Sequence, residues 1–202
     1  MANAPVLGVA PGVPTARDPL VLAVIGAGPT ASSLLERLVA NVPELLDGRP
    51  LEVHLVDPHR AGTGRVWRPD LDPLLWMNSM AEDVTMFTDD TVRCEGPIRP
   101  GPSLYEWSQD IDDATLAELA SPALAAEIRG LTGMTFPTRL VQSVYLEWYH
   151  RRVLAALPPA VDIVPHDTRA VDLRDGSDGR QWITLDGVAE PLVADVVVLA
   201  MA

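Results

Sequence analysis

The stretch Leu20-Val-Leu-Ala-Val-Ile-Gly-Ala-Gly-Pro-Thr-Ala31 decides the fold class of this chain. Its first six residues are all apolar and stop abruptly at Gly26, a pattern typical of a strand buried on both faces. Apolar residues then recur at helical spacing between Ser32 and Val42. A strand that leads through a glycine turn into an amphipathic helix predicts an α/β fold with a parallel sheet.

The glycine turn, Gly26-Ala27-Gly28-Pro29-Thr30-Ala31, fits the dinucleotide fingerprint G-x-G-x-x-A. Gly26 permits the tight turn, Gly28 lets the backbone approach a pyrophosphate, and Ala31 permits close packing of helix and strand. Backbone N–H groups and the helix dipole would hold the anion, so the site needs no basic side chain. A glycine-rich turn that binds no nucleotide is the alternative interpretation of these residues.

A second predicted strand, residues 51–56, ends at Asp57 and completes a βαβ unit with parallel strands. An acidic residue in this place binds the ribose hydroxyls in dinucleotide folds. Asp57 follows Gly26 by 31 residues, and the long connection over residues 43–50 accounts for the excess over the about 20 of the compact fold. An Asp before Pro58 is also a common turn residue, so its position is what makes Asp57 a site candidate.

The rest of the chain predicts a long loop, helices and a hairpin. Residues 58–104 are rich in Gly, Pro, Asp and Arg and predict mainly loop. The patterns further predict two helices within 103–129, a helix over 140–157, strands over 161–164 and 194–200, and a hairpin of 170–173 with 182–185. Ten carboxylates and two arginines fall between Glu82 and Glu118, so the acidic excess is concentrated in this segment.

The composition limits the classes of partner and site. The chain has 28 acidic residues and 15 basic ones, all Arg, and its net charge of −13 argues against nucleic acid and anionic membranes as partners. No run reaches the about 18 apolar residues that a membrane-spanning helix needs. The lone cysteine, Cys94, excludes a disulfide framework and has no predicted partner, and the four histidines lack metal-ligand spacing. We therefore expect a cytoplasmic protein without a metal site.

Four segments, in this order, resemble the N-terminal FAD-binding region of two-dinucleotide flavoproteins, and most of all flavin-containing monooxygenases and bacterial FAD/NAD(P)-binding proteins. The segments are Val24-Ile25-Gly26-Ala27-Gly28-Pro29; Asp57 with Gly62-Thr63-Gly64-Arg65-Val66-Trp67; Phe136-Pro137-Thr138-Arg139 with Tyr145-Leu146 and Trp148-Tyr149; and Asp195-Val196-Val197-Val198-Leu199-Ala200. The resemblance implies an α/β, Rossmann-like FAD-binding domain with a parallel sheet, a β-hairpin or meander and a helical insertion. We expect this domain over residues 20–202 after a flexible tail at residues 1–19, with residues 82–130 as the acidic insertion.

The resemblance also implies the residues of the cofactor site. The diphosphate would lie on Gly26, Gly28, Pro29, Thr30 and Ala31, and Asp57 would bind the adenosine ribose. The loop of Gly62, Gly64, Arg65, Val66 and Trp67 would run along the flavin, Met77 and Asn78 would line the isoalloxazine, and Thr168 would border adenine. Ala200 lies where relatives carry Ala-Thr-Gly, and this chain reads Ala200-Met201-Ala202. In the alternative interpretation, Trp67 and Met77 are packing residues and Asn78 caps a turn.

The function implied by the resemblance is that of the FAD-binding part of a flavin-dependent, monooxygenase-like oxidoreductase with NADPH or NADH as reductant. No second G-x-G-x-x-G occurs among the 202 residues, so we expect the NAD(P)H domain to come from further sequence or a second protein chain. No catalytic side chain is assigned. The alternatives are a non-catalytic nucleotide-binding or protein-interaction module derived from such an enzyme, and NAD in place of FAD at the single site.

Overall fold

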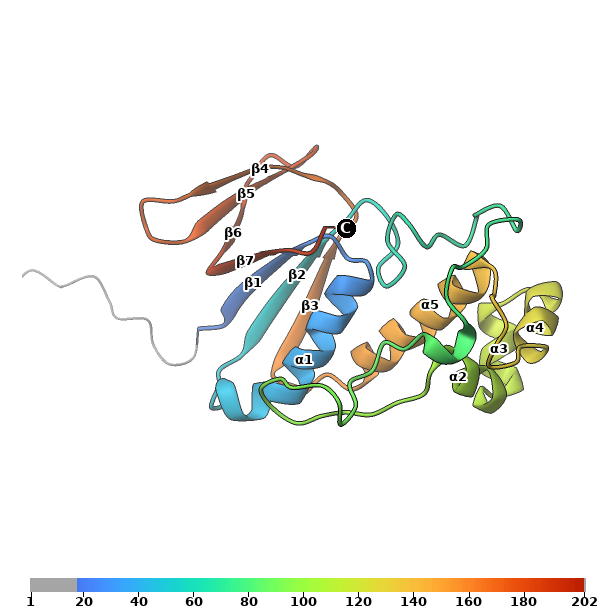
Figure 1. Cartoon of the computed structure of the whole chain (residues 1–202). Helices are drawn as coiled ribbons and strands as arrows, with labels where there is room; N and C mark the ends of the chain where they lie inside the picture. The colour runs from blue at the N-terminus through green and yellow to red at the C-terminus, as the bar shows by residue number, and fades with distance from the viewer. Residues whose placement is uncertain (1–17, 202) are drawn as a thin grey trace, which may run out of the picture.

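The computed structural model describes residues 18–201, which form a parallel sheet, an antiparallel sheet and a set of helices (Figure 1). The parallel sheet has the order β3-β2-β1-β7, with β1 at Leu20–Ile25, β2 at Leu51–Val56, β3 at Val161–His166 and β7 at Val196–Leu199. Leu20 pairs with Leu51 and Leu51 with Val161, so β1, β2 and β3 start and end together. All pairings in this sheet are parallel, which confirms the predicted βαβ unit.

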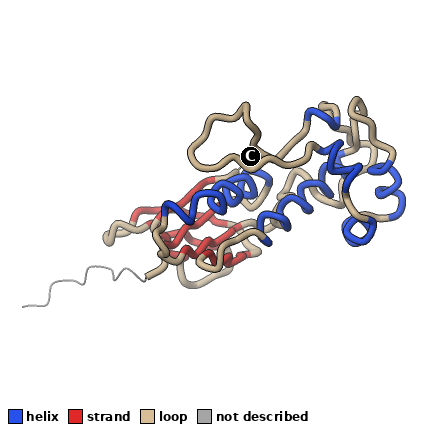
Figure 2. Tube along the Cα trace, turned by 90° about the horizontal axis from the view of Figure 1, so that it is seen from below, coloured by secondary structure: helices blue, strands red, loops and turns tan. Residues whose placement is uncertain are grey.

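Two long helices cover one face of the parallel sheet (Figure 2). They are α1 (Pro29–Leu45) and α5 (Arg139–Ala155), which pack against each other and against the strands. Leu35 of α1 and Tyr149 of α5 are fully buried in the core that results. The pattern predicts α1 over residues 32–42, and the helix is longer at both ends. Proline is favourable in the first turn of a helix, where Pro29 lies, and the helix continues for two residues past Pro43.

A small antiparallel sheet covers the opposite face. Its strands are β4 (Ala170–Asp175), β5 (Gln181–Leu185) and β6 (Leu192–Ala194), in the order β4-β5-β6, which confirms the predicted hairpin. Apolar residues of the two sheets form a second core, made of Ala23, Ile25, Val56, Ile183, Leu185 and Ala194. The parallel sheet is thus enclosed between this meander and the helices α1 and α5 (Figure 1).

The strand predicted over residues 194–200 is present as β7, but it starts later than predicted and is not fully buried. The segment contains the end of β6 and the whole of β7, which belong to different sheets. The chain changes sheet at Asp195, whose N–H donates to the Val21 carbonyl (2.9 Å) and whose Oδ2 accepts from the Val21 N–H (2.8 Å). β7 is an edge strand, and its Val196 and Leu199 are 46% and 57% exposed.

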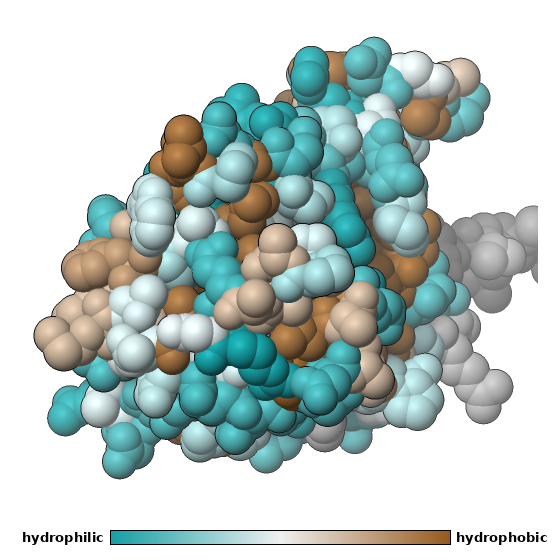
Figure 3. Space-filling model, turned by 90° about the vertical axis from the view of Figure 1, so that its right-hand side faces the viewer, coloured by the Kyte–Doolittle hydropathy of each residue, from teal (hydrophilic) through white to brown (hydrophobic). Residues whose placement is uncertain are grey.

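Three short helices within the acidic insertion lie beside the N-terminal half of α5 (Figure 1). They are α2 (Leu104–Asp110), α3 (Asp113–Leu119) and α4 (Pro122–Arg129), and the 3-10 turn η1 (Ala81–Asp83) precedes them. The sequence predicts two helices here and the structure has three, because α2 ends at Ile111 and Asp112 caps α3 by accepting from the Thr115 N–H at 2.9 Å. Figure 3, which faces this end of the molecule, shows hydrophobic residues scattered between hydrophilic ones.

The remaining predictions concern the ends of the chain and its location. Residues 1–17 and Ala202 lie outside the described residues, so the tail over residues 1–19 and the domain boundary at residue 20 stay predictions. Between residues 18 and 201, no helix has the length and apolar character needed to cross a membrane. The cytoplasmic location also stays a prediction.

Candidate functional site

A cavity of about 570 Å³ opens at the carboxyl ends of the parallel strands. Ile25 and Val56, the last residues of β1 and β2, line it together with Ala200, which follows β7. Ten predicted site residues meet here: Gly26, Gly28, Pro29, Thr30, Asp57, Gly64, Arg65, Val66, Trp67 and Ala200. Open α/β sheets bind ligands at this edge, and ligand pockets typically have volumes of about 300–1,000 Å³.

The N-terminus of α1 opens on the cavity without a side-chain cap. The other four α-helices within residues 18–201 are each capped, by Ser103, Asp112, Ser121 and Thr138. α1 instead follows Gly28 and has no acidic residue in its first turn. The unpaired N–H groups at a helix start attract an anion through hydrogen bonds and the helix dipole. The start of α1 is therefore suited to a phosphate group.

The two fingerprint glycines serve different purposes. Gly26 has a φ of +98°, and a Cβ on it would lie 2.6 Å from the carbonyl oxygen of Ala200. Gly28 has an ordinary φ of −78°, and a Cβ on it would meet only the Gly64 Cα, at 3.8 Å. Gly26 is thus required by the close approach of two strand ends, whereas Gly28 keeps free the space in front of α1.

A second glycine loop lies against the first. The Gly62 N–H donates to the Ala27 carbonyl at 2.7 Å, and a Cβ on Gly64 would lie 2.9 Å from the Gly28 Cα. Both loop glycines have a positive φ, +88° for Gly62 and +60° for Gly64. The predicted site residues Gly62 and Ala31 are buried and do not line the cavity. They lie on the side of the glycine turn that faces away from the cavity, while Gly64 and the residues after it border the cavity.

Asp57 lines the cavity and also stabilises the turn in which it lies. Its Oδ2 accepts from the Ala27 N–H at 2.9 Å, and its Oδ1 accepts from the His59 N–H at 2.8 Å. The bond to His59 is the turn contact expected of an Asp before proline. The bond to Ala27 joins the end of β2 to the glycine turn. Because a carboxylate oxygen accepts two hydrogen bonds, each oxygen retains a position for a ligand hydroxyl.

Two large polar side chains of the cavity lining were not predicted from the sequence. His59 and Arg169 line the cavity with the predicted Arg65. Each lies three residues beyond the end of a parallel strand, β2 for His59 and β3 for Arg169. This position, at the edge where such sheets bind ligands, is the signal that could have identified them. The other unpredicted lining residues are Ile25, Val56, Pro58, Thr63, Ala170 and Met201.

Besides Gly62 and Ala31, three more predicted residues do not line the cavity: Met77, Asn78 and Thr168. The Met77 N–H donates to the Pro137 carbonyl at 2.8 Å, and the neighbouring Asn78 is exposed. Thr168 is half-buried beside Arg169, and its Oγ1 donates to the Asp186 carbonyl at 2.8 Å. Their contacts with a cofactor stay predictions.

The family model described as FAD-NAD(P)-binding matches residues 23–202. The chain belongs to the FAD-NAD(P)-binding family. This confirms the resemblance drawn from the four sequence segments and the expectation of FAD as the cofactor of the domain.

Curated relatives of this FAD-NAD(P)-binding chain are much longer. Nitrosuccinic acid synthase npaA of Aspergillus oryzae is 43% identical over 176 residues, which cover 87% of this chain and 25% of that protein. An L-aspartate N-monooxygenase (nitrosuccinate-forming) of Streptomyces cremeus is 38% identical over 189 residues, covering 90% and 28% respectively. The chain therefore spans about a quarter of the length of these relatives. The solved structure of the ornithine N-hydroxylase of Kutzneria sp. 744 is similar, with a TM-score of 0.49 and 17% sequence identity. The similarity covers 91% of this chain and 37% of the chain of that protein.

Two histidines of this FAD-NAD(P)-binding domain meet outside the cavity. His54 Nδ1 lies 2.7 Å from His166 Nε2, and His54 Nε2 lies 2.6 Å from Glu52 Oε1. Burial lowers the pKa of His166, and the electrostatic interaction with the neighbouring His54 ring lowers it further. No group of three or more His, Cys, Asp or Glu side chains in residues 18–201 is placed to hold a metal ion.

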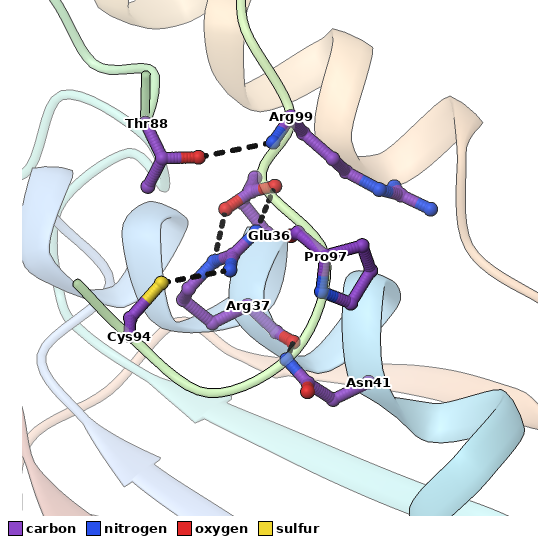
Figure 4. A network of polar contacts seen from close by, with 7 residues as sticks. All are labelled: Glu36, Arg37, Asn41, Thr88, Cys94, Pro97 and Arg99. Atoms are coloured by element: carbon purple, nitrogen blue, oxygen red, sulfur yellow. Dashed lines mark hydrogen bonds and ion pairs between the residues drawn. The ribbon is translucent and has the colours of Figure 1, made fainter. Parts of the chain in front are cut away.

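Cys94, which had no predicted partner, lies beside Arg37 of α1 (Figure 4). Arg37 Nη1 donates to the Cys94 Sγ at 3.4 Å, and Nη2 donates to the Pro97 carbonyl at 3.0 Å. Arg37 also binds Glu36 through two bonds of 2.7 and 2.9 Å. Cys94 is exposed and does not line the cavity, so we assign this network the role of holding the loop against α1.

Proposed function

We propose that the chain binds FAD in this cavity, with the diphosphate at the start of α1. The observation that carries the proposal is the uncapped first turn of α1, with the open space at Gly28 in front of it. Neutral backbone N–H groups are the donors there, which explains how a chain with a net charge of −13 holds an anion. FAD, when bound, supplies the redox chemistry, and the protein binds and orients it.

The predicted residues receive the following roles. Asp57 accepts the adenosine ribose hydroxyls in the positions that Ala27 and His59 leave free. Gly64, Arg65, Val66 and Trp67 border the flavin half, and the Arg139 guanidinium, 5.4 Å from the Trp67 ring centroid, helps to fix the indole. Met77 and Asn78 on the flavin side, and Thr168 on the adenine side, contact the parts of FAD that extend beyond the cavity.

For the whole protein, we propose a flavin-dependent N-monooxygenase that oxygenates the amino nitrogen of L-aspartate. The support is the identity of 43% and 38% to a nitrosuccinic acid synthase and to an L-aspartate N-monooxygenase. NADPH or NADH is the proposed reductant, since the matching family is described as FAD-NAD(P)-binding. The reductant and substrate sites are proposed to lie in further sequence or in a second protein chain.

The cofactor proposal is tested by titrating the chain with FAD and with NADPH side by side. We expect FAD binding with a change in flavin fluorescence, and at least about 10-fold weaker binding by Gly28→Ala, since a methyl group would occupy the diphosphate position. The fold should tolerate this methyl, whose nearest contact would be at 3.8 Å. Gly130→Ala is the matched control, because its Cβ would make contacts of 3.4 and 3.5 Å at the end of α4. Equal FAD affinities of the two variants, or tighter binding of NADPH than of FAD, would contradict the proposal.

The substrate proposal requires the complete protein. We expect oxidation of NADPH to depend on L-aspartate and to yield a product that mass spectrometry identifies as N-oxygenated. D-aspartate and L-glutamate are the controls, since they differ only in configuration or by one methylene group. NADPH oxidation that ignores the amino acid, with no oxygenated product, would refute it.

A further inference from the structure

The start of α1 and the second glycine loop both contact one buried side chain, His150 of α5. His150 is 6% exposed, and its Nδ1 lies 2.9 Å from the Oγ of Ser32, which is 1% exposed and belongs to the first turns of α1. The same Ser32 Oγ is 3.5 Å from the Gly28 carbonyl oxygen, which also accepts from the Ser32 N–H at 3.1 Å. A polar chain thus runs from α5 to the carbonyl of the second fingerprint glycine.

The second glycine loop lies on the other side of the same histidine. A Cβ on Gly62 would come within 2.7 Å of the His150 Cβ and 2.9 Å of its Cγ, so the loop backbone rests directly on this side chain. From there the Gly62 N–H reaches the Ala27 carbonyl in the fingerprint turn. His150 therefore contacts the second glycine loop directly, by close packing, and is linked to the first glycine turn through Ser32.

The surroundings of His150 favour the neutral ring. Burial lowers the pKa of His150, and the nearby charges, Glu147 on the same helix and Arg60 on the glycine loop, act in opposite directions. These two residues form an ion pair of 2.6 Å, which ties the loop to α5 one turn away from His150. A neutral imidazole has one donor and one acceptor nitrogen, so Nδ1 forms a single, directed bond with Ser32.

We infer that His150 is a positioning residue, which holds the turn at Gly28 and the loop at Gly62 in the arrangement that dinucleotide binding needs. The part of this inference that concerns the ligand rests on the proposed function. His150 is not a catalytic residue, because it does not line the cavity. A packing role of His150 would need only the volume of the side chain, whereas a positioning role needs a polar atom in the place of Nδ1.

The test compares His150→Leu, which keeps an apolar volume, with His150→Asn, whose amide lies in about the place of Nδ1. Ser32→Ala removes the other partner of the bond and completes a double-mutant cycle. Val144→Ala is the control, since this buried residue of the same helix belongs to the helical core and not to the cavity. The readouts are amide hydrogen exchange of the ligand-free chain in residues 27–32 and 60–64, and FAD affinity.

We expect the backbone amides of both segments to exchange faster in His150→Leu. We also expect this variant to bind FAD about 10-fold more weakly, because losing a buried hydrogen bond costs about 1.4 kcal/mol, which corresponds to a factor of ten in affinity. His150→Asn should restore both properties toward the wild type. Adding Ser32→Ala to His150→Leu should change the exchange rates and the FAD affinity little further. Equal behaviour of the Asn and Leu variants, or faster exchange spread over the whole chain as in Val144→Ala, would overturn the inference.

The two measurements distinguish a failure of the proposed FAD binding from a failure of the positioning role of His150. If the wild-type chain does not bind FAD, the proposed function fails, and the hydrogen-exchange pattern of the ligand-free variants still decides the role of His150. If the wild type binds FAD and all His150 variants bind it equally well, the proposed function stands and the inference fails. Should His150→Leu not fold, Ser32→Ala alone replaces it, because this small change removes the same hydrogen bond.

Discussion

Gly26 and Ala200 touch through their backbones. A Cβ on Gly26 would lie 2.6 Å from the Ala200 carbonyl oxygen, and the Ala200 N–H donates to the carbonyl of Ile25 at 2.8 Å. The close approach that defines this corner of the cavity is therefore between the ends of β1 and β7. The side chain of Ala200 is compatible with it, because the residue that must lack a Cβ is Gly26.

Gly26→Ala is expected to destabilise the fold with or without cofactor. The new methyl group would clash with a main-chain oxygen, and the residue would have to keep a φ of +98°, which alanine rarely adopts. Strain and overpacking of this kind each cost about 1–3 kcal/mol, so we expect a loss of roughly 2–6 kcal/mol in the free energy of unfolding. Urea denaturation measures it, with Gly28→Ala as the control that keeps its stability. Equal unfolding midpoints for the two variants would show that the Gly26 contact is not as close as described.

Asp195→Ala tests the position where the chain passes from one sheet to the other. The substitution removes the side-chain acceptor of the Val21 N–H, and Val21 is half-buried. An unpaired backbone donor costs about 1–3 kcal/mol. Asp195→Asn retains a carbonyl oxygen in the same place and should lose less. Thermal or urea unfolding distinguishes the two, and a wild-type stability of Asp195→Ala would argue that the side chain is not part of the pairing.

The contrast between β1 and the segment around Asp195 explains how much of the fold the sequence predicts. Leu20–Ile25 and the glycine turn after it are encoded by adjacent residues, and the prediction matches the strand. The segment after Leu192 is almost continuously apolar and reads as one strand. Its division depends on a hydrogen bond to Val21, 174 residues away, which no local pattern contains.

The candidate site divides in the same way. Gly28 and Asp57 are predictable, because a fingerprint and the end of a predicted strand mark them. Arg169 could have been found from its place after a parallel strand, but the strand predicted over residues 161–164 ends two residues before β3 does. His150 is not predictable, because its contact with Ser32 depends on how α5 packs against α1, which is far away in the chain. Met77 rests on the family resemblance alone, and its place outside the cavity leaves its role a prediction.

Asp57→Ala is expected to weaken both the fold and the binding of FAD. It removes the acceptor of two backbone N–H groups, those of Ala27 and His59, which should cost about 1–3 kcal/mol of stability. It also removes the proposed ribose acceptor, for which we expect about 10-fold weaker FAD binding. Urea denaturation and FAD titration give the two quantities.

The control for Asp57 is Asp72→Ala. Asp72 Oδ1 accepts from the Leu74 N–H at 2.8 Å, the same turn contact that Asp57 makes with His59, but Asp72 does not line the cavity. Its loss should leave FAD affinity unchanged. If Asp57→Ala also binds FAD like the wild type, Asp57 is only a turn residue and the assigned ribose contact is wrong.

The stability of the chain is expected to fall as the pH drops from about 7.5 to 5.5, the range around the ordinary histidine pKa. Burial lowers the pKa of His150 and of His166 in the folded chain, whereas both titrate near pH 6.5 when unfolded. Below that pH the unfolded chain binds protons that the native chain does not, so acidification favours unfolding until the folded pKa is reached. The contribution of His150 has a slope of at most about 1.4 kcal/mol per pH unit. Urea denaturation of the wild type and of His150→Asn at several pH values should give a flatter profile for the variant. Val144→Ala, which loses stability without losing a histidine, should keep the wild-type slope, and an unchanged slope in His150→Asn would rule out His150 as the source.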